Sequence, residues 1–470
     1  MRALCLIPWL LLLGCVGPRG DDDDATVPDD DDTPFDDDDT ADDDDTADDD
    51  DAADDDDSTA PSTGLDDALA LLQSGATAEV LDGLLHNVGW AGRWPMNDGD
   101  RWLFATRWDG AAQLSLAGDI NAWDPLATPA TRTSSGTHWF VLVQTDSFDV
   151  PAAGAKYKWT DGTDWGAPAE ATAYFFDDNG RFGYVAPPTA SVWAEQFPDL
   201  ATAGLPLPRT IRALLPAGFV PGAGPVRTLL MHDGQNLFDP SAFGGGWQMD
   251  EELAGGDYDD VVLLAVDNTA DRLDVYAHVA DEPFGNGVSY GGEADAYLAL
   301  LQDEVLPHFR ARYSIPATET SLMVAGSSMG GLVSLYLARQ WDGQVGCVAA
   351  LSPTLGWGAF GADGTQALVN LWPTTPGHGT VPIFLYSGGN VFGAGCVDTD
   401  GDGVQEDSDD QDNHCTTNQF RDTLAAAGYA FETDLWHWWE PGAQHVEPAW
   451  TAQVGRMLES CSESGWSAAL

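Results

Sequence analysis

Hydrophobic and polar positions follow two successive patterns along the chain. After a helical segment at Leu65–Leu85, they alternate over short stretches bounded by Gly, Asp and Pro, as in Leu103–Thr106, Trp139–Val143 and Tyr157–Trp159. Alternation with a period of two predicts half-buried strands. Several short strands of this kind are typical of an antiparallel β-sandwich. We therefore predict a small β-sandwich domain over residues 65–187.

The second pattern begins after Pro188, where apolar runs of strand length alternate with segments of helical spacing. Between these runs, 292–312 carries apolar residues at helical intervals. Strands that alternate with helices favour a mainly parallel sheet. We therefore predict an α/β domain over 188–470, with buried strands at Ile211–Leu215, Arg227–Met231, Val261–Val266, Leu322–Ala325, Gly346–Leu351 and Pro382–Ser387.

One of these strands leads abruptly into a helix through the segment Gly326–Gly331, which reads Gly-Ser-Ser-Met-Gly-Gly. Glycines beside a sharp turn remove the Cβ atoms that would clash there. The pattern is the G-x-S-x-G nucleophile elbow of α/β-hydrolases, in which the central serine is exposed at the tip of the turn. It predicts Ser328 as the nucleophile and the N–H of Met329 as an oxyanion donor. The alternative is a Ser/Gly turn without chemistry.

The first residues have the features of an export signal. Arg2 precedes an apolar run, Leu4–Leu13, that is too short to span a bilayer comfortably, and Gly14-Cys15 supplies small residues for cleavage. Leu12 to Cys15 also resembles the lipobox of bacterial lipoproteins, which implies that Cys15 is acylated. We expect an exported protein, lipid-anchored at the bacterial cell envelope, with residues 1–20 as its signal. An ordinary signal peptide is the alternative.

Residues 21–64 consist largely of Asp runs spaced by Ala, Thr and Pro. Such a segment cannot bury a core, and its charges repel one another, so we predict a disordered acidic tether. Removing its 24 Asp from the 77 acidic residues of the chain leaves 53, against 18 Lys and Arg. This balance argues against nucleic acid as a partner and leaves the lipid anchor as the expected membrane contact.

Two sets of motifs resemble known proteins. Leu116–Trp123, which contains Gly-Asp-x-Asn-x-Trp, together with Tyr157–Trp159, resembles the immunoglobulin-like domains that precede glycan-active enzymes and some siderophore esterases. We interpret Trp123 and Trp159 as core residues, with sugar binding as the alternative. The second resemblance covers about Arg209 to Leu458, and its motifs are Leu229–Phe238, Val266–Asn268 with Arg272, Gly326–Gly331 and Leu351–Pro353.

These motifs look like the α/β-hydrolase family that includes enterochelin esterases, esterase D and feruloyl or acetyl-xylan esterases. The resemblance implies a serine esterase that needs no cofactor for catalysis. Acyl transfer needs a base, and Pro441–Trp450 is similar to the family's G-x-x-H-x-E-x-x-W segment, so we predict His445. A second oxyanion donor is expected from Gly234 or Gln235, because they follow an early strand.

The third member of the catalytic group is less obvious. The family usually carries an acidic residue shortly after the strand that ends at Ser387, but the segment Ser387–Val391 contains none. A Ser/His dyad is one alternative. The other is an acid from the inserted loop that follows, where Asp412 precedes the next helix. We choose Asp412.

The inserted loop, 396–415, also carries a pattern of metal ligands. Oxygen ligands at every second residue, with a glycine at the sixth position, are typical of the twelve-residue calcium loop. The segment also resembles the calcium repeats of thrombospondin type 3, although its last position is Asp where the calcium loop has Glu. A solvated acidic loop is the alternative. We predict a structural Ca²⁺ held by Asp398, Asp400, Asp402, the Val404 carbonyl, Glu406 and Asp409.

The six cysteines agree with export into an oxidising compartment. Cys5 lies in the signal and Cys15 is the lipidation site, which leaves four cysteines with three possible pairings. We predict that Cys396 pairs with Cys415 across the calcium loop, leaving Cys347 with Cys461.

The substrate is the weakest inference from the sequence. The 19 Trp residues include several beside the motif loops, which would suit sugar rings or aromatic acyl groups. We expect an exported serine esterase that acts on a small-molecule or polysaccharide-linked ester, with a glycan-linked acyl group preferred. Three alternatives stay open: a siderophore-lactone esterase, a non-catalytic surface glycan-binding lipoprotein, and an acyltransferase for envelope sugars.

Overall fold

The computed structural model describes residues 63–200, 204–255, 258–315, 318–341, 343–372, 381–389, 395–405 and 412–468. Gly64 to Leu470 form one compact unit. The predicted signal, Cys15 and nearly all of the acidic tether lie outside the described residues, as do Glu406 and Asp409. None of the helices in the described ranges has the length and apolar character needed to cross a membrane.

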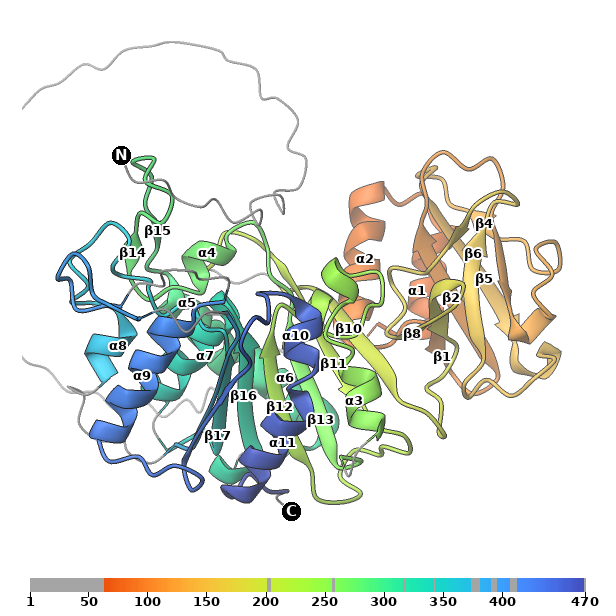
Figure 1. Cartoon of the computed structure of the whole chain (residues 1–470). Coiled ribbons are helices and arrows are strands. Elements are labelled where there is room, and N and C mark those ends of the chain that lie inside the picture. Colours follow the sequence, from red (N-terminus) through yellow and green to blue (C-terminus); the bar gives the residue numbers. More distant parts are fainter. Residues whose placement is uncertain are drawn as a thin grey trace, which may run out of the picture. The chain divides into compact units, whose positions relative to one another are not determined.

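The α/β part is built on a mainly parallel sheet, as predicted, with helices on both of its faces (Figure 1). Six parallel strands lie in the order β19-β18-β17-β16-β12-β13, and antiparallel β11 and β10 continue the sheet beyond β13. Their bounds are β10 (Trp193–Leu200), β11 (Arg209–Leu215), β12 (Arg227–His232), β13 (Val261–Val266), β16 (Leu322–Ser327), β17 (Cys347–Leu351), β18 (Ile383–Ser387) and β19 (Leu435–Trp439).

Continuous apolar runs form these strands because helices exclude water from both faces. Every residue of β13, β16, β17 and β18 is buried. The segment predicted as a single helix, 292–312, consists of α5, a π-helical turn at Leu301–Val305, and α6. The helices of this part are α3 (Met249–Gly255), α4 (Arg272–Val275), α5 (Ala294–Leu300), α6 (Leu306–Tyr313), α7 (Met329–Gln340), α8 (Leu368–Leu371), α9 (His414–Ala426), α10 (Glu447–Thr451) and α11 (Val454–Glu463).

The N-terminal part is an antiparallel β-sandwich. One layer has the strand order β1-β2-β5-β4, and the other is β8-β9-β6-β3 with β7 beside β6. Alternating residues of the two layers pack together, and Phe104, Trp139 and Trp159 are buried between them. The strands are β1 (Met96–Asn97), β2 (Arg101–Arg107), β3 (Ser115–Gly118), β4 (Thr131–Arg132), β5 (His138–Gln144), β6 (Lys156–Thr160), β7 (Trp165–Gly166), β8 (Ala173–Asp177) and β9 (Gly180–Tyr184).

Two details of the sandwich differ from the sequence interpretation. The predicted helix Leu65–Leu85 is two helices, α1 (Leu65–Gln73) and α2 (Ala78–Trp90), because the Thr77 side chain caps a new helix by accepting from Val80 N–H. Trp159 is buried as expected, but Trp123 is only half-buried. Its backbone has a φ of 60°, and its indole N–H donates to Asp119 at 2.7 Å.

The sheet is continuous through the predicted domain junction. β10 follows that junction and pairs with β8 of the sandwich on one side and with β11 on the other. Within β10, the buried carboxylate of Glu195 accepts hydrogen bonds from Arg312 and from the Tyr313 hydroxyl of α6. The sandwich therefore extends the main sheet and is joined to it by backbone pairing and by buried polar contacts.

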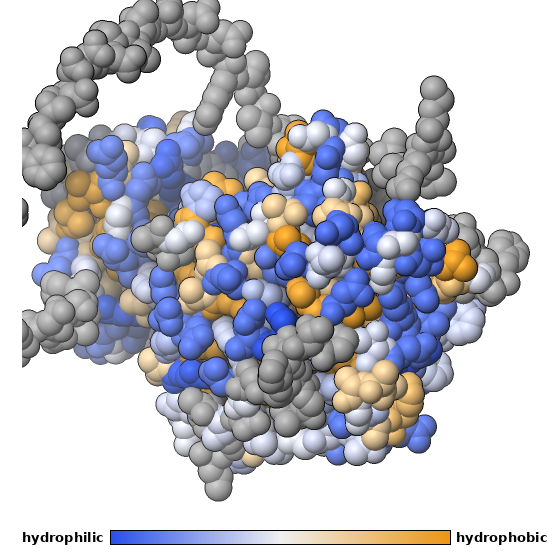
Figure 2. Space-filling model, turned by 90° about the vertical axis from the view of Figure 1, so that its left-hand side faces the viewer, coloured by the Kyte–Doolittle hydropathy of each residue, from blue (hydrophilic) through white to orange (hydrophobic). Residues whose placement is uncertain are grey.

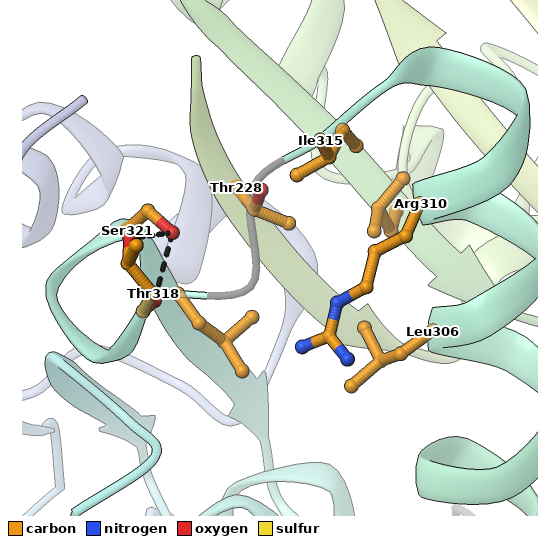
Figure 3. Close-up of a pocket in the computed structure, with 8 residues that line it drawn as sticks. Thr228, Leu306, Arg310, Ile315, Thr318 and Ser321 are labelled. Carbon is orange, nitrogen blue, oxygen red and sulfur yellow. Dashed lines mark hydrogen bonds between the residues drawn. The ribbon is translucent and has the colours of Figure 1, made fainter. Parts of the chain in front are cut away.

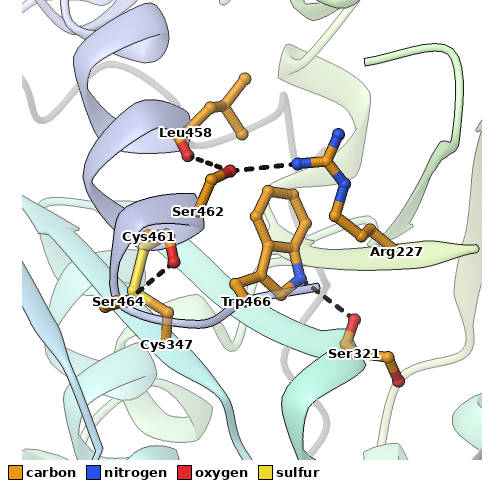
Figure 4. Close-up of a disulfide and its surroundings, with 8 residues drawn as sticks. All are labelled: Arg227, Ser321, Cys347, Leu458, Cys461, Ser462, Ser464 and Trp466. Carbon is orange, nitrogen blue, oxygen red and sulfur yellow. Dashed lines mark hydrogen bonds between the residues drawn. A yellow bond between two sulfur atoms is a disulfide. The ribbon is translucent and has the colours of Figure 1, made fainter. Parts of the chain in front are cut away.

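The predicted disulfide pairs, Cys347–Cys461 and Cys396–Cys415, are both present. The first joins the start of β17 to α11 across 114 residues (Figure 4). Beside it, the Trp466 indole N–H donates to the Ser321 carbonyl at 3.1 Å, and Arg227 donates to the Ser462 hydroxyl at 3.0 Å. These contacts hold the C-terminal helix against the sheet at the edge where the parallel strands begin.

On the face shown in Figure 2, hydrophobic residues form small separate groups among hydrophilic ones. Among the described residues, exposed large apolar side chains include Leu126, Val220 and Phe360. Isolated apolar residues of this kind are ordinary on protein surfaces. The part of this face drawn in colour therefore offers no broad apolar surface.

Candidate active site

The nucleophile candidate Ser328 occupies the turn between β16 and α7. Its backbone, with φ 56° and ψ −124°, lies in a region that L-residues rarely adopt. A Cβ on Gly326 would lie 2.6 Å from the carbonyl carbon of Gly330, and a Cβ on Gly331 would lie 3.2 Å from the Gly326 carbonyl oxygen. Only glycines permit so close a crossing of the strand and the helix.

Neighbouring loops fix the position of Ser328. Its N–H donates to the Leu351 carbonyl at 3.0 Å, and its own carbonyl accepts from Thr354 N–H at 3.2 Å. The half-buried hydroxyl lies 3.4 Å from the Thr354 hydroxyl, which is its hydrogen-bonding partner among the described residues. The neighbouring loops therefore hold the backbone of Ser328, while its hydroxyl makes one long contact with Thr354.

His445 follows β19, and Ser328 follows β16, so both lie after the carboxyl ends of parallel strands in one sheet. The His445 ring packs edge-on against Trp450, with ring centroids 5.0 Å apart. Its Nδ1 lies 2.8 Å from Oδ1 of Asp412. With Nδ1–H donating to a carboxylate, Nε2 carries the lone pair that a general base needs.

Asp412 lies just before α9 and is 1% exposed. Its second carboxylate oxygen accepts from the N–H of Gly388, which follows β18. A Cβ at Gly388 would lie 2.5 Å from that oxygen, so this close approach requires glycine. Burial raises the pKa of Asp412, while hydrogen bonds from His445, Ser352 and Gly388 oppose that rise.

The residues that hold Asp412 were not identified from the sequence. Ser352 follows β17, has a φ of 47°, and accepts from the Trp450 indole N–H at 3.1 Å. Its backbone carbonyl accepts from Asn413 Nδ2 at 3.0 Å. A serine and a glycine beside strand ends are common, so the printed chain gives no signal for this role. Their function follows only from the folded loops.

The predicted oxyanion donors come from two neighbouring strand ends. Gly234 and Gln235 begin a 3₁₀ turn, Gly234–Asn236, directly after β12, which pairs with β16. The first N–H groups of a helical turn have no acceptor within it, as is also true of Met329 at the start of α7. A Cβ on Gly330 would lie 3.2 Å from Asp233 Oδ2, so the two turns are in contact. The two turns that carry the predicted donors therefore lie side by side.

Asp233 precedes the 3₁₀ turn Gly234–Asn236 and has a φ of 58°. Arg272 donates to both of its carboxylate oxygens, at 2.7 and 2.8 Å, and Asn268 donates to Oδ1. Gln235 in turn receives the N–H of Asn268 at 3.0 Å. Asp233 is therefore engaged in holding the loops after β12 and β13 together.

His437 is another histidine of the sheet. It lies on β19, where Nε2 is 3.0 Å from the Ser387 hydroxyl and Nδ1 is 3.3 Å from the Arg421 guanidinium. Burial lowers the pKa of His437 to about 3. Both ring nitrogens of His437 thus contact Ser387 and Arg421, which argues against His437 as the base.

The acidic insertion brings three predicted ligands together. Carboxylate oxygens of Asp398, Asp400 and Asp402 lie within 4.8 Å of one another, and Gly403 has a φ of 88°. Asp398 accepts from the N–H groups of Gly401 and Gly403, at 2.6 and 2.9 Å. Three oxygen donors on a tight turn fit the preference of Ca²⁺.

The cavity in Figure 3 lies at the opposite end of the strands, beside Thr228 at the start of β12 and Ser321 just before β16. Its volume is about 10 Å³, which is room for about one water molecule. A substrate cannot enter such a space. The carboxyl ends of the strands therefore remain the candidate active site, as is usual for parallel sheets.

The mainly parallel sheet and the strand-to-helix elbow at Ser328 define an α/β-hydrolase. The family described as "Putative esterase" matches residues 202–455, which is more than half of the chain. The chain belongs to this family and is a carboxylic ester hydrolase. No curated protein in the comparison matches the sequence.

Solved structures with a similar fold include three esterases or related hydrolases. The enterobactin esterase of Shigella flexneri is 15% identical, with a TM-score of 0.41, covering 78% of this chain and 95% of that one. An IroE-like serine hydrolase of Shewanella oneidensis is 15% identical, with a TM-score of 0.43, covering 57% and 78%. A ferulic acid esterase is 14% identical, with a TM-score of 0.39, covering 58% and 99%.

Proposed function

We propose that the protein is a serine esterase in which Ser328, His445 and Asp412 act together. His445 takes the proton of Ser328 as its Oγ attacks the ester carbonyl carbon. The N–H groups of Met329 and of the Gly234–Gln235 turn stabilise the oxyanion. The protonated His445 then gives its proton to the departing alcohol. A water deprotonated by His445 attacks the acyl group, which releases the acid and restores Ser328.

The observation that carries this proposal is the 2.8 Å contact between His445 Nδ1 and Asp412 Oδ1, at the sheet edge that also holds the Ser328 turn. Burying a carboxylate costs free energy, so buried carboxylates are often found at functional sites. Orienting a catalytic base is one such function. A rotation of the Ser328 side chain away from Thr354 would free its hydroxyl for His445. Catalytic hydrogen bonds are often longer before substrate binds.

Labelling with a fluorophosphonate probe tests the proposal directly. The wild-type protein should be labelled and should hydrolyse a nitrophenyl ester, whereas Ser328→Ala should do neither, with a loss of about 10⁴-fold or more. Ser334→Ala is the matched control, since Ser334 lies in the same helix and donates to the Gly330 carbonyl at 2.7 Å. A folded Ser328→Ala variant with wild-type turnover, or a wild type that hydrolyses the ester without being labelled, would overturn this mechanism.

We propose acyl groups esterified to glycans as the substrate class. The support comes from the sandwich, where Trp123 lines an open groove of about 500 Å³ together with Asp119 and Asp149. The ring of Trp165, which is 46% exposed, lies next to the Trp123 ring, and the two ring centroids are 6.2 Å apart. Exposed aromatic faces beside carboxylates suit sugar rings and their hydroxyl groups. The net charge of −59 disfavours strongly anionic substrates.

We further propose that the protein is exported and anchored by lipid at Cys15, with 21–64 as the spacer. The support is the residue pattern Leu12 to Cys15 and the run of Asp that follows. Metabolic labelling with an alkyne fatty acid in a bacterial host should mark the wild type and not Cys15→Ser. Equal labelling of both proteins would show that Cys15 is not the lipidated residue.

Finally, we propose that the insertion binds a structural Ca²⁺ through Asp398, Asp400, Asp402 and the Val404 carbonyl. Glu406 and Asp409, outside the described residues, complete the proposed set. The three described carboxylates and the bend at Gly403 support this proposal. The ion would neutralise an insertion that otherwise repels itself, close to the segment that carries Asp412.

A further inference from the structure

One buried carboxylate has a place in the site that the reaction above does not explain. Glu447 lies two residues after His445, at the start of α10, and is 3% exposed. Its Oε1 accepts a hydrogen bond from Asn236 Nδ2 at 2.8 Å. Asn236 is the last residue of the turn that begins with Gly234 and Gln235. A single hydrogen bond therefore joins the segment of the base to the segment of the oxyanion donors.

The surroundings leave this pair little freedom. A Cβ on Gly244 would lie 2.5 Å from Glu447 Oε2, so the loop after the oxyanion turn closes over the carboxylate. The backbone N–H of Trp247 donates to the Asn236 carbonyl at 2.9 Å. Its ring stacks on Trp450 of α10, with centroids 5.9 Å apart. Helix α10, which follows His445, thus contacts Asn236 directly through Glu447 and indirectly through Trp247.

The hydrogen bond between Glu447 and Asn236 is not an efficient way to stabilise the fold. Within the described part of the chain, Glu447 Oε2 and Asn236 Oδ1 are both buried without a hydrogen-bond partner. Burial raises the pKa of Glu447, which reflects the cost of ionising it there. Apolar residues of similar size would pack without that cost. A costly buried group of this kind is expected where function requires a defined geometry.

We infer that Glu447 is a positioning residue that, through Asn236, fixes the distance between the base His445 and the oxyanion donors at Gly234 and Gln235. This inference rests on the proposed function. The reaction needs His445 at hydrogen-bonding distance from the Ser328 hydroxyl, and the oxyanion donors at hydrogen-bonding distance from the carbonyl oxygen of the ester that this hydroxyl attacks. Errors near 1 Å are costly in rate. Glu447 itself contacts neither the substrate nor the Ser328 hydroxyl. It acts through the hydrogen bond, so a neutral acceptor at this position serves equally.

The test uses the full-length protein and a nitrophenyl ester. Glu447→Ala and Asn236→Ala should each lower kcat about 10- to 100-fold while changing KM less than about 3-fold. The double variant should be no slower than the slower single variant, because both remove one contact. Glu447→Gln should keep kcat within about 3-fold of wild type, because its amide oxygen accepts the same hydrogen bond. Glu440→Ala, which changes an exposed residue in the loop that carries His445, should have no effect.

Melting temperatures and fluorophosphonate labelling rates separate the outcomes. A purely structural role would lower the melting temperature while leaving kcat per labelled active site unchanged, and that result would overturn the inference. Losses that multiply in the double variant, or a Glu447→Gln variant as slow as Glu447→Ala, would also overturn it. If Glu447→Ala does not fold, Asn236→Ala decides the question alone. Wild-type activity in Ser328→Ala would instead overturn the proposed function.

Discussion

Nδ1 of His445 lies 2.8 Å from Oδ1 of Asp412, although Asp412 comes from the end of an acidic insertion and His445 from the loop after the last strand. The second Asp412 oxygen is held by the N–H of Gly388, directly after β18. That strand end usually carries the acid in the family the sequence resembles. Here the strand end supplies a hydrogen-bond donor, and the insertion supplies the carboxylate.

Asp412→Asn should separate activity from folding. The amide can keep the fold, but it cannot stabilise the imidazolium that forms during the reaction, and it favours the wrong tautomer of His445. We expect kcat to fall by about 10²- to 10⁴-fold. Steady-state kinetics with a nitrophenyl ester will show this. A variant within about 3-fold of wild type would leave a Ser/His dyad as the mechanism.

The same variant should be more stable than the wild type at neutral pH. Because burial raises the pKa of Asp412, the folded state holds this proton more tightly than the unfolded state does. Above the raised pKa, the ionised Asp412 carboxylate therefore lowers the free energy of unfolding of the wild type. The wild type regains this free energy as the pH falls through that pKa. Urea unfolding at several pH values should show that the advantage of Asp412→Asn is largest near pH 7 and shrinks toward pH 4. An advantage independent of pH would contradict this.

The two disulfides should have different effects. Cys347–Cys461 spans 114 residues and lies at the edge away from Ser328, so its removal by a double Ser substitution should lower the free energy of unfolding by about 3 to 5 kcal/mol. The activity of this double variant at 25 °C should stay near that of the wild type. Cys396–Cys415 spans 19 residues and ends three residues after Asp412, so its removal should lower kcat. Equal effects of both double variants on kcat would contradict this distinction.

Removing calcium should loosen the insertion. With a chelator present, the wild type should melt at a lower temperature and lose part of its activity, and added Ca²⁺ should restore both. Asp400→Asn should melt at the chelated temperature with or without Ca²⁺. Asp146→Asn, exposed in the sandwich, is the control and should respond like the wild type. A wild-type melting temperature insensitive to chelator would exclude the site.

Glycan recognition by the sandwich can be tested apart from catalysis. Trp123→Ala and Trp165→Ala should weaken retention of the protein in a gel containing acetylated xylan, while turnover of a nitrophenyl ester stays unchanged. Trp438→Ala removes a tryptophan that is 41% exposed on β19, and serves as the control. If the two sandwich variants migrate like the wild type, the groove does not bind this glycan.

The local pattern of residues in the sequence is sufficient to predict much of the architecture. Apolar runs such as Val261–Val266 mark buried strands, since neither face offers a place for a polar side chain. The glycines around Ser328 predicted the strand-to-helix turn, because the backbone there tolerates no Cβ. The predicted calcium loop suggested the pairing of Cys396 with Cys415, which left Cys347 with Cys461, and both disulfides are present. These features depend on neighbours in the sequence or on simple elimination.

Other features were decided only by the tertiary structure. Trp123 was interpreted as a core residue, yet a left-handed backbone conformation leaves it half-buried beside a groove. The predicted helix Leu65–Leu85 divides at Thr77, whose side chain caps the second helix. The groups that hold Asp412, and the hydrogen bond between Glu447 and Asn236, join segments far apart in the chain. No local pattern records such contacts, because they exist only once the strand ends are brought to one edge of the sheet.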